Sequence, residues 1–296
     1  WFLGAYQHLR DYDSKPGADP AFPRRYQQDK IFAKLTWRFT PGLQLMQSYH
    51  EEFWENPDRP TLTNPFETTT RPNAHVPAIT FADLTHTLSP NTMWSVRVGR
   101  FVYYQFAPTS NELRSTTNHL KQVTNVNSFA PQQFTGTMLI RTTVKATLNQ
   151  YRPGLFGADQ EWKVGTQFER GEHYGPAIIP GGVRFVDNPN QQPFQSVSAP
   201  PSNNGGLFNT VALFASDTLT LGKRLTVNAG VRFDHSVAIS QDIPAVDALG
   251  NEIDGKVAGS DKLYTWNVVS PRLGVTQRLT DDGRTITACI DVSRCL

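Results

Sequence analysis

The sequence has few cysteines, no long apolar run and little net charge. Its 296 residues carry a formal net charge of +2, too small to indicate nucleic acid as a partner. No segment approaches the roughly 18 consecutive apolar residues of a membrane-spanning helix, so a transmembrane helix is excluded. The two cysteines, Cys289 and Cys295, match neither a metal-ligand spacing nor a disulfide framework. The first 13 residues lack the features of a signal peptide.

What the chain has instead is alternation of apolar and polar residues. In RLTVNAGVRFDH (224–235) every second residue from Leu225 to Phe233 is apolar, with polar residues or glycine between. Successive side chains of a strand point to opposite faces of its sheet, so this pattern predicts a strand with one apolar face. The same pattern recurs at 31–39, 93–101, 138–148, 161–169 and 269–279. The sequence is therefore predicted to be all-β.

The connections alternate between short and long. Short turns with Pro, Gly or Asp-Gly fall at 39–43, 88–92, 151–159, 221–225 and 279–284. Long polar segments fall at 13–28, 56–78, 107–133, 173–208 and 237–264. This layout predicts about eleven strands of roughly 11 to 17 residues, longer than the strands of ordinary globular sheets. Short periplasmic turns and long extracellular loops are typical of an outer-membrane barrel, whereas a soluble sandwich has no reason to place every long loop at one end.

Aromatic residues gather near both ends of the predicted strands. Two aromatic belts are expected where a barrel crosses the water–lipid interfaces, although aromatic residues also stabilise strands elsewhere. The residues near the short turns are Trp37, Phe39, Trp94 and Trp162, and those near the long loops are Phe53, Tyr104, Phe106, Phe168, Phe233 and Trp266.

The stretch VALFASDTLTLGKRLTVNAGVRFD (211–234) resembles a hairpin of TonB-dependent receptor barrels. The matching residues are Phe214, Ser216, Asp217, Arg224, Leu225, Asn228, Gly230, Arg232, Phe233 and Asp234. Segments 267–287 and 29–54 look like further hairpins of this family, the latter especially of its Oar-like members. The resemblance implies that residues 1–296 form part of an antiparallel transmembrane barrel of roughly 22 strands in the cell outer membrane.

The family also implies partners that this sequence does not itself encode. Its members carry an N-terminal plug domain and a short box that binds the TonB energy-coupling complex, and neither is found here. We therefore expect a receptor fragment whose partners are outer-membrane lipid, its own plug domain and the TonB complex, with a ligand that the sequence does not identify. Residues 288–296, ACIDVSRCL, depart from the family and predict a truncation or frameshift, with a divergent final strand as the alternative.

No constellation of residues argues for catalysis, a cofactor or a metal. In HEEF (50–53) His50 and Glu52 would share one face of a strand and Glu51 would point to the other, and residue 54 is Trp where a metal motif needs histidine. The other histidines have no ligand spacing, and no serine lies in a nucleophile elbow. We expect a protein that is not an enzyme and has no metal site.

The phase of the alternation predicts which charged residues face the lumen. Basic residues dominate, so the lumen would favour an anionic ligand or an acidic plug surface, unless these charges merely solvate the wall and pair across strands. The predicted lumen-facing candidates are Lys34, Arg38, Arg97, Arg141, Lys145, Lys163, Arg232, Asp234 and Arg272, with Glu169 beside them. Arg232 and Asp234 are expected to pair locally or to dock the plug. The predicted ligand contacts in the extracellular loops are Tyr174, Phe185, Phe194 and Phe208.

The expected function is energy-coupled uptake of a scarce ligand such as a siderophore, a vitamin or an oligosaccharide. A passive porin-like barrel is one alternative. A secreted soluble β-sandwich that binds carbohydrate or mediates adhesion is another, and an outer-membrane enzyme is a third that the residues do not favour.

Overall fold

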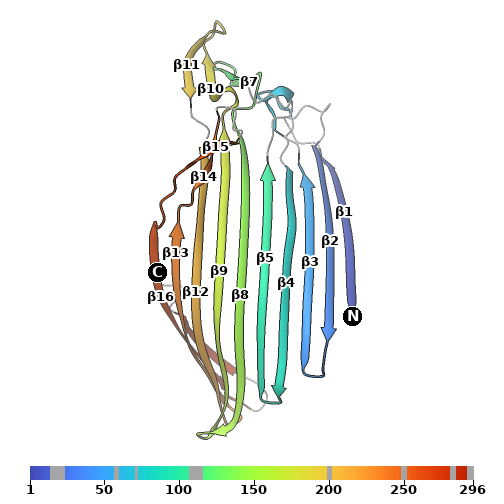
Figure 1. Cartoon of the computed structure of the whole chain (residues 1–296), viewed down its shortest axis with the longest axis vertical. Coiled ribbons are helices and arrows are strands. Elements are labelled where there is room, and N and C mark those ends of the chain that lie inside the picture. Colours follow the sequence, from blue (N-terminus) through green and yellow to red (C-terminus); the bar gives the residue numbers. More distant parts are fainter. Residues whose placement is uncertain are drawn as a thin grey trace.

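One large antiparallel sheet dominates the computed structural model, which describes residues 1–13, 24–56, 60–70, 73–106, 116–198, 202–247, 252–280 and 285–291. It has 11 strands in the order β1-β2-β3-β4-β5-β8-β9-β12-β13-β16-β17 (Figure 1). This confirms the prediction of about eleven antiparallel strands. Their bounds are β1 Phe2–Asp13, β2 Arg24–Arg38, β3 Leu43–Glu55, β4 Asn73–Ser89, β5 Thr92–Phe106, β8 Phe134–Leu155, β9 Ala158–Ile178, β12 Ser202–Leu221, β13 Leu225–Ile239, β16 Tyr264–Arg278 and β17 Thr285–Asp291.

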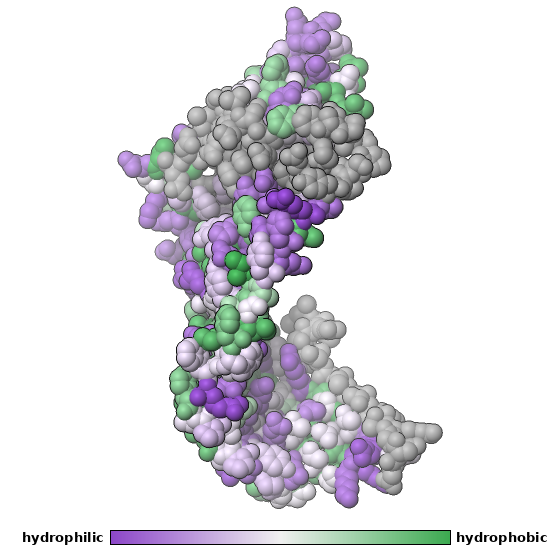
Figure 2. Space-filling view, turned by 90° about the vertical axis from the view of Figure 1, so that its right-hand side faces the viewer, coloured by the Kyte–Doolittle hydropathy of each residue, from purple (hydrophilic) through white to green (hydrophobic). Residues whose placement is uncertain are grey.

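The sheet is open. Within the described residues, β1 and β17 stand at the two ends of the strand order and do not pair with each other. Seen from the side of β1, the molecule curves around a concavity like a section of a barrel wall (Figure 2). The backbone of β17 pairs with β16, with Cys289 opposite Gly274. Cys295 and the rest of 292–296 lie outside the described residues, so the prediction about this end stays a prediction.

The two faces of the sheet carry different side chains, as the alternation predicts. Apolar residues on the convex face are open to the surroundings: Val231 is 48% exposed and Val269 62%. On the concave face Ala212 is fully buried and Asp83 is 8% exposed, among polar neighbours. A strand pleat with this polarity is what a barrel wall needs if it faces lipid outside and water inside.

Three strands run further than the sequence predicts. β8, β9 and β12 have 22, 21 and 20 residues. Because β9 continues to Ile178 and β12 begins at Ser202, Tyr174 and Phe208 lie on sheet strands, and their prediction as loop residues is wrong. The polar, glycine-rich stretches 171–176 and 202–206 look like loops in sequence. They remain strands because β9 pairs with β8 on one side and β12 on the other.

A small second sheet lies beyond the long-loop end of the strands (Figure 1). It has the order β11-β10-β6-β7, with bounds Pro193–Ser198, Val183–Asp187, Asn118–Lys121 and Val126–Ser128. His119 joins its strands by a hydrogen bond of 3.0 Å to Asp187, and its ring packs at 5.0 Å from the ring of Phe185. A hairpin of β14 (Ile243–Val246) and β15 (Glu252–Val257) lies in the last long connection.

Helices are confined to two 3-10 turns among the described residues, η1 (Phe66–Thr68) and η2 (Pro180–Gly182). No helix in this part of the chain is long and apolar enough to cross a membrane.

Phenylalanine rings of β12 lie over glycines of β9. Phe214 is opposite Gly165, and Phe208 is opposite Gly171. A Cβ atom added to Gly165 would lie 2.4 Å from the ring of Phe214 and 2.4 Å from the carbonyl oxygen of Ala146. The absence of a side chain at Gly165 leaves room for the ring of Phe214. The ring in turn packs over the glycine, which otherwise weakens a strand because it has no side chain to pack.

We predict that Gly165→Ala destabilises the sheet by about 1–3 kcal/mol, because the methyl group overlaps backbone as well as ring. Gly206→Ala on β12 is the matched control, since its nearest neighbour would be the carbonyl oxygen of Ile239 at 3.7 Å. Urea unfolding of both variants in detergent measures the difference. Equal loss of stability in the two variants would show that the close approach at Gly165 does not matter.

Candidate functional site

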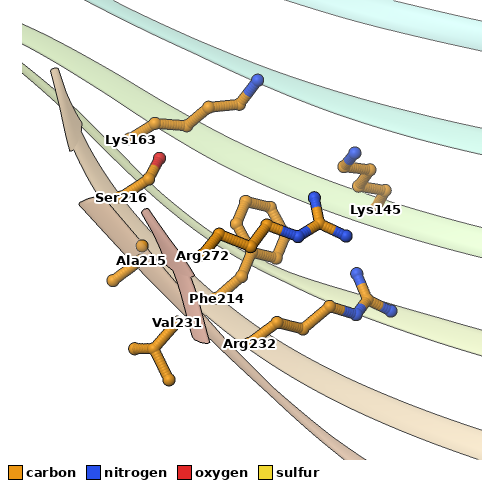
Figure 3. Close-up of a pocket in the computed structure, with 9 residues that line it drawn as sticks. Lys145, Lys163, Phe214, Ala215, Ser216, Val231, Arg232 and Arg272 are labelled. Carbon is orange, nitrogen blue, oxygen red and sulfur yellow. The ribbon is translucent and has the colours of Figure 1, made fainter. Parts of the chain in front are cut away.

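A hollow on the concave face collects basic side chains from several strands. Its volume is about 340 Å³, and its lining includes Lys145 of β8, Lys163 of β9, Arg232 of β13 and Arg272 of β16. Figure 3 shows their cationic groups gathered around Phe214, with Ala215 and Val231 pointing away. No carboxylate is among the residues that line it. We call this the basic hollow.

The register explains why these cations meet. Lys163, Ser216, Gly230 and Arg272 lie opposite one another in a single row across β9, β12, β13 and β16. The middle positions of the row are small, so the long side chains at either end can lean into the space above them. In the next row the ring of Phe214 stands between Gly165 and Arg232. The hollow is thus the space above Ser216 and Gly230, between the cationic side chains of Lys163 and Arg272.

Phe214 holds one of the cations by its ring face. The Nζ atom of Lys145 lies 5.3 Å from the centre of that ring. Ring faces attract cations by their quadrupole, and the attraction is strongest where water is partly excluded. Phe214 therefore places the ammonium group over the hollow without neutralising it.

The other predicted lumen-facing arginines are held by carboxylates. Arg232 donates hydrogen bonds from Nε and Nη2 to the carboxylate of Asp234 at 2.8–3.0 Å, which is the local pair that the sequence predicts. Arg141 donates from Nη2 to Glu169 at 2.7 Å. The Nε atom of Arg97 donates to the nearly buried Asp83 at 2.8 Å. Arg97 and Arg141 thus pair across strands, whereas Arg232 pairs along its own strand.

Lys145 and Lys163 differ from these arginines. Among the described residues, no carboxylate forms an ion pair with either ammonium group. Two unneutralised lysines beside Arg232 and Arg272 repel one another. The same field raises the local concentration of anions, and the low-dielectric wall strengthens it. The arrangement is suited to binding or guiding a negative group.

A second, larger hollow lies nearer the long-loop end of the same face. Its volume is about 800 Å³, and its lining includes Phe101, Arg141, Phe208 and Tyr264. These residues share one row of the sheet with Gly171 and Ala238 between them. The small residues leave space for flat groups between the rings. We call this the aromatic hollow.

The remaining predicted residues lie elsewhere. The Nζ atom of Lys34 lies 5.3 Å from the centre of the Trp1 ring, and Arg38 is the last residue of β2. Phe185 packs against His119 in the small sheet, and Phe194 lies on β11. The structure therefore brings Lys145, Lys163, Arg232 and Arg272 together and leaves Lys34 and Arg38 apart from them.

Apart from Phe208, which was predicted as a loop residue that contacts the ligand, sequence reasoning missed the aromatic residues of both hollows. Phe101, Phe214 and Tyr264 were not predicted as site residues, although the phase of the flanking valines and leucines places Phe214 on the polar face. Trp266 was assigned to an outer belt, but it lies on the concave face opposite Ser236, with its ring 4.6 Å from that of Tyr264. The alternation of its own strand, read from Val269 backwards, could have shown this.

His50 and Glu52 share a face of β3, and the Nε2 atom of His50 lies 3.5 Å from the Oε2 atom of Glu52. On the other face, the Oε1 atom of Glu51 lies 2.8 Å from the Nε2 atom of His75. This is the arrangement that the sequence predicts for HEEF. In the part of the chain that the structure describes, no group of three or more histidine, cysteine or acidic residues is placed to hold a metal ion.

A family model described as "TonB dependent receptor-like, beta-barrel" matches residues 11–287. No curated protein sequence matches the chain.

Solved receptors have the same fold at low identity. The ferric-catecholate import receptor Fiu of E. coli in its closed form aligns with a TM-score of 0.61 and 12% identity, over 95% of this chain and 45% of its own. The hemophore receptor HasR of Serratia marcescens gives 0.61 and 15%, over 97% and 40%. The ferripyoverdine receptor of Pseudomonas aeruginosa gives 0.58 and 12%, over 98% and 41%. The chain thus spans less than half the length of these similar proteins.

We predict that Asp234→Asn strengthens anion binding at the basic hollow by about tenfold, because it releases the Arg232 guanidinium from its carboxylate. Binding of citrate to the full-length protein in detergent, followed by calorimetry, measures the change. Glu161→Gln, an exposed substitution near the short-turn end of β9, is the control for net charge. The same gain in both variants would mean that only overall charge matters.

Proposed function

Because the chain belongs to the TonB-dependent receptor family of β-barrels, we propose that it forms part of the wall of an outer-membrane transporter that takes up a scarce anionic ligand by energy-coupled gating. The family and the similar solved structures are receptors and transporters rather than enzymes. The observation that carries the anionic preference is the basic hollow, where Lys145 and Lys163 have no carboxylate partner among the described residues.

The two hollows suggest a route along the concave face. The aromatic hollow lies at the long-loop end, which is extracellular in barrels of this type. Its rings offer stacking surfaces for flat apolar groups, while Arg141 offers a partly exposed guanidinium beside them. The basic hollow lies deeper along the same strands. A ligand with aromatic and anionic parts would contact the rings first and the cations next.

Several similar receptors are named for iron chelates. Three of the similar solved structures are a ferric-catecholate import receptor, a ferric citrate transporter and a ferripyoverdine receptor. A catecholate combines an aromatic ring with anionic oxygens, as the order of the two hollows requires. We propose an iron chelate with net negative charge as the ligand class for this chain. In the whole protein, a plug domain would fill the lumen, and the TonB complex would displace it when energised.

The alternative partner of the basic hollow is an acidic surface of the plug. Ligand binding and plug docking differ in what they require. A docked plug would neutralise the cations at all times, whereas an anionic ligand would do so only in transit.

The test is uptake of radiolabelled iron(III) chelates of negative, zero and positive net charge by cells that produce the full-length protein. We expect uptake of the negative chelate, and its loss when a protonophore collapses the energy supply. Lys145→Gln with Lys163→Gln should weaken binding of that chelate by about a hundredfold or more, since each of the two charge-assisted hydrogen bonds contributes roughly 1.5–3 kcal/mol. Lys223→Gln, in the short turn after β12, is the matched control.

Each other outcome has a definite meaning. Uptake that persists after the protonophore would indicate a passive pore and overturn energy coupling. Unchanged binding and uptake in the double lysine variant would overturn the role of the basic hollow in ligand passage. Loss of the folded barrel in that variant, with ligand binding intact in the control, would favour plug docking instead.

A further inference from the structure

The convex face of β5 carries an arginine within an apolar stripe. Val96, Val98 and Val102 point to that face, and Arg100 lies between them in the same phase. Its side chain is exposed, and within the described residues it forms no ion pair. On the concave face, by contrast, Arg97, Arg141 and Arg232 have carboxylates beside them. Arg100 therefore needs a partner that the described residues do not supply.

Arg100 belongs to a continuous polar row across the convex face. The register places Tyr49, Thr80, Arg100, Thr142, Arg170 and Asn209 opposite one another from β3 to β12. Only Thr142 separates the two arginines in the row, so their backbones are about 10 Å apart, or two strand spacings. Arginine side chains are long enough to converge across that gap.

Glu172 holds Arg170 in place without covering it. The Nε atom of Arg170 donates to Glu172 at 2.6 Å. The side chain of Arg170 remains 43% exposed, so its other donors can reach a ligand. Because Glu172 lies two residues closer to the long-loop end, this contact turns the guanidinium toward the extracellular side.

The two rows that border the polar row are mainly apolar. Ala82, Val98, Val144, Phe168 and Val211 form the neighbouring row on the short-turn side. The row on the other side contains Val102, Ile140 and Leu207, with Glu172 between Ile140 and Leu207. A molecule that pairs with the arginines must therefore place apolar groups beside its anion. Inorganic phosphate would gain no such contact, whereas a lipid has both parts.

Tyrosines mark the level of this row. Tyr49 lies in the row and is 37% exposed, and Tyr104, four residues beyond Arg100 on the same face, is 42% exposed. Tyrosine is enriched where a membrane protein meets the headgroups. An arginine on the lipid face is disfavoured at the midplane and tolerated at the interface, where its head can reach a phosphate.

We infer that Arg100 and Arg170 bind the phosphate of an outer-leaflet lipid against the outer wall of the barrel. The planar guanidinium forks suit phosphate oxygens, and the bordering valines contact the acyl chains. This inference rests on the outer-membrane location in the proposed function. It adds a site on the lipid face, separate from the two hollows of the concave face.

The test reconstitutes the full-length protein in nanodiscs of digalactosyldiacylglycerol, a bilayer lipid without phosphate, that contain either lipopolysaccharide or enzymatically dephosphorylated lipopolysaccharide. The measured quantity is lipopolysaccharide retained per protein after detergent extraction and gel filtration. We expect Arg100→Gln and Arg170→Gln each to lower retention by about fivefold, the effect of one cation near anionic headgroups. Arg100→Lys should be intermediate, because it keeps the charge and loses the fork.

Lys223→Gln, in the turn at the opposite end of the strands, should retain as much as the unchanged protein. Retention that survives dephosphorylation, or that is equal in all variants, would overturn the lipid site. Failure of the unchanged protein to insert into any disc would count against the membrane location itself. Release of the lipopolysaccharide by millimolar inorganic phosphate alone would show a simple anion site and also overturn the lipid site.

The thermal stability of the variants gives a second readout that a folding defect does not mimic. In discs of digalactosyldiacylglycerol alone, a lipid without phosphate, Arg100→Leu should leave the melting temperature unchanged or raise it, because an apolar residue replaces a charge on the lipid face. In discs with lipopolysaccharide the same substitution should lower it. A decrease of equal size in both discs would reveal a general packing defect and contradict the inference.

Discussion

The structure depends on one constraint: in a membrane, every backbone N–H and C=O group of a strand needs a partner in a neighbouring strand. Hydrocarbon offers none, so strands must join edge to edge in a continuous sheet. Once they do so, the pleat sends alternate side chains to opposite faces. The sequence obeys this with valine, leucine and phenylalanine on the convex face and with charges on the concave face. Both hollows and the polar row on the outside follow from that division.

The same pairing explains why some strands are longer than the alternating apolar pattern predicts. β8, β9 and β12 extend well past the apolar stripe, with 22, 21 and 20 residues. Glycines and asparagines at 202–206 favour loops locally, but this part of β12 pairs with β9 and so forms a strand. The extensions carry Phe208 inward over Gly171 and support the small sheet beyond them. Local propensity therefore loses to tertiary pairing at this end of the barrel.

The sequence predicts which face of the sheet a side chain points to. It does not predict which side chains on other strands that residue contacts. Parity alone placed Lys145, Lys163, Arg232 and Arg272 on the polar face. Their convergence depends on the register of β9 with β12 and of β12 with β13, which the turns set and which parity does not reveal. The pairing of Arg232 with Asp234 was predictable because both residues lie on one strand. Phe208 was assigned to a loop because its neighbours resemble one, so the aromatic hollow was missed as a unit.

Cations on the two faces obey different physical rules. On the concave face water can solvate an unpaired ammonium, so Lys145 and Lys163 can stand beside two arginines at modest cost and attract anions from solution. On the convex face the surrounding medium is apolar, and a charge there is tolerated only near a headgroup or beside a counter-ion. Arg170 meets this requirement in part through Glu172, at 2.6 Å. Arg100 shares its row but has no such carboxylate among the described residues. The same alternation that builds the wall thus makes an unpaired cation useful for transport on one face and dependent on lipid on the other.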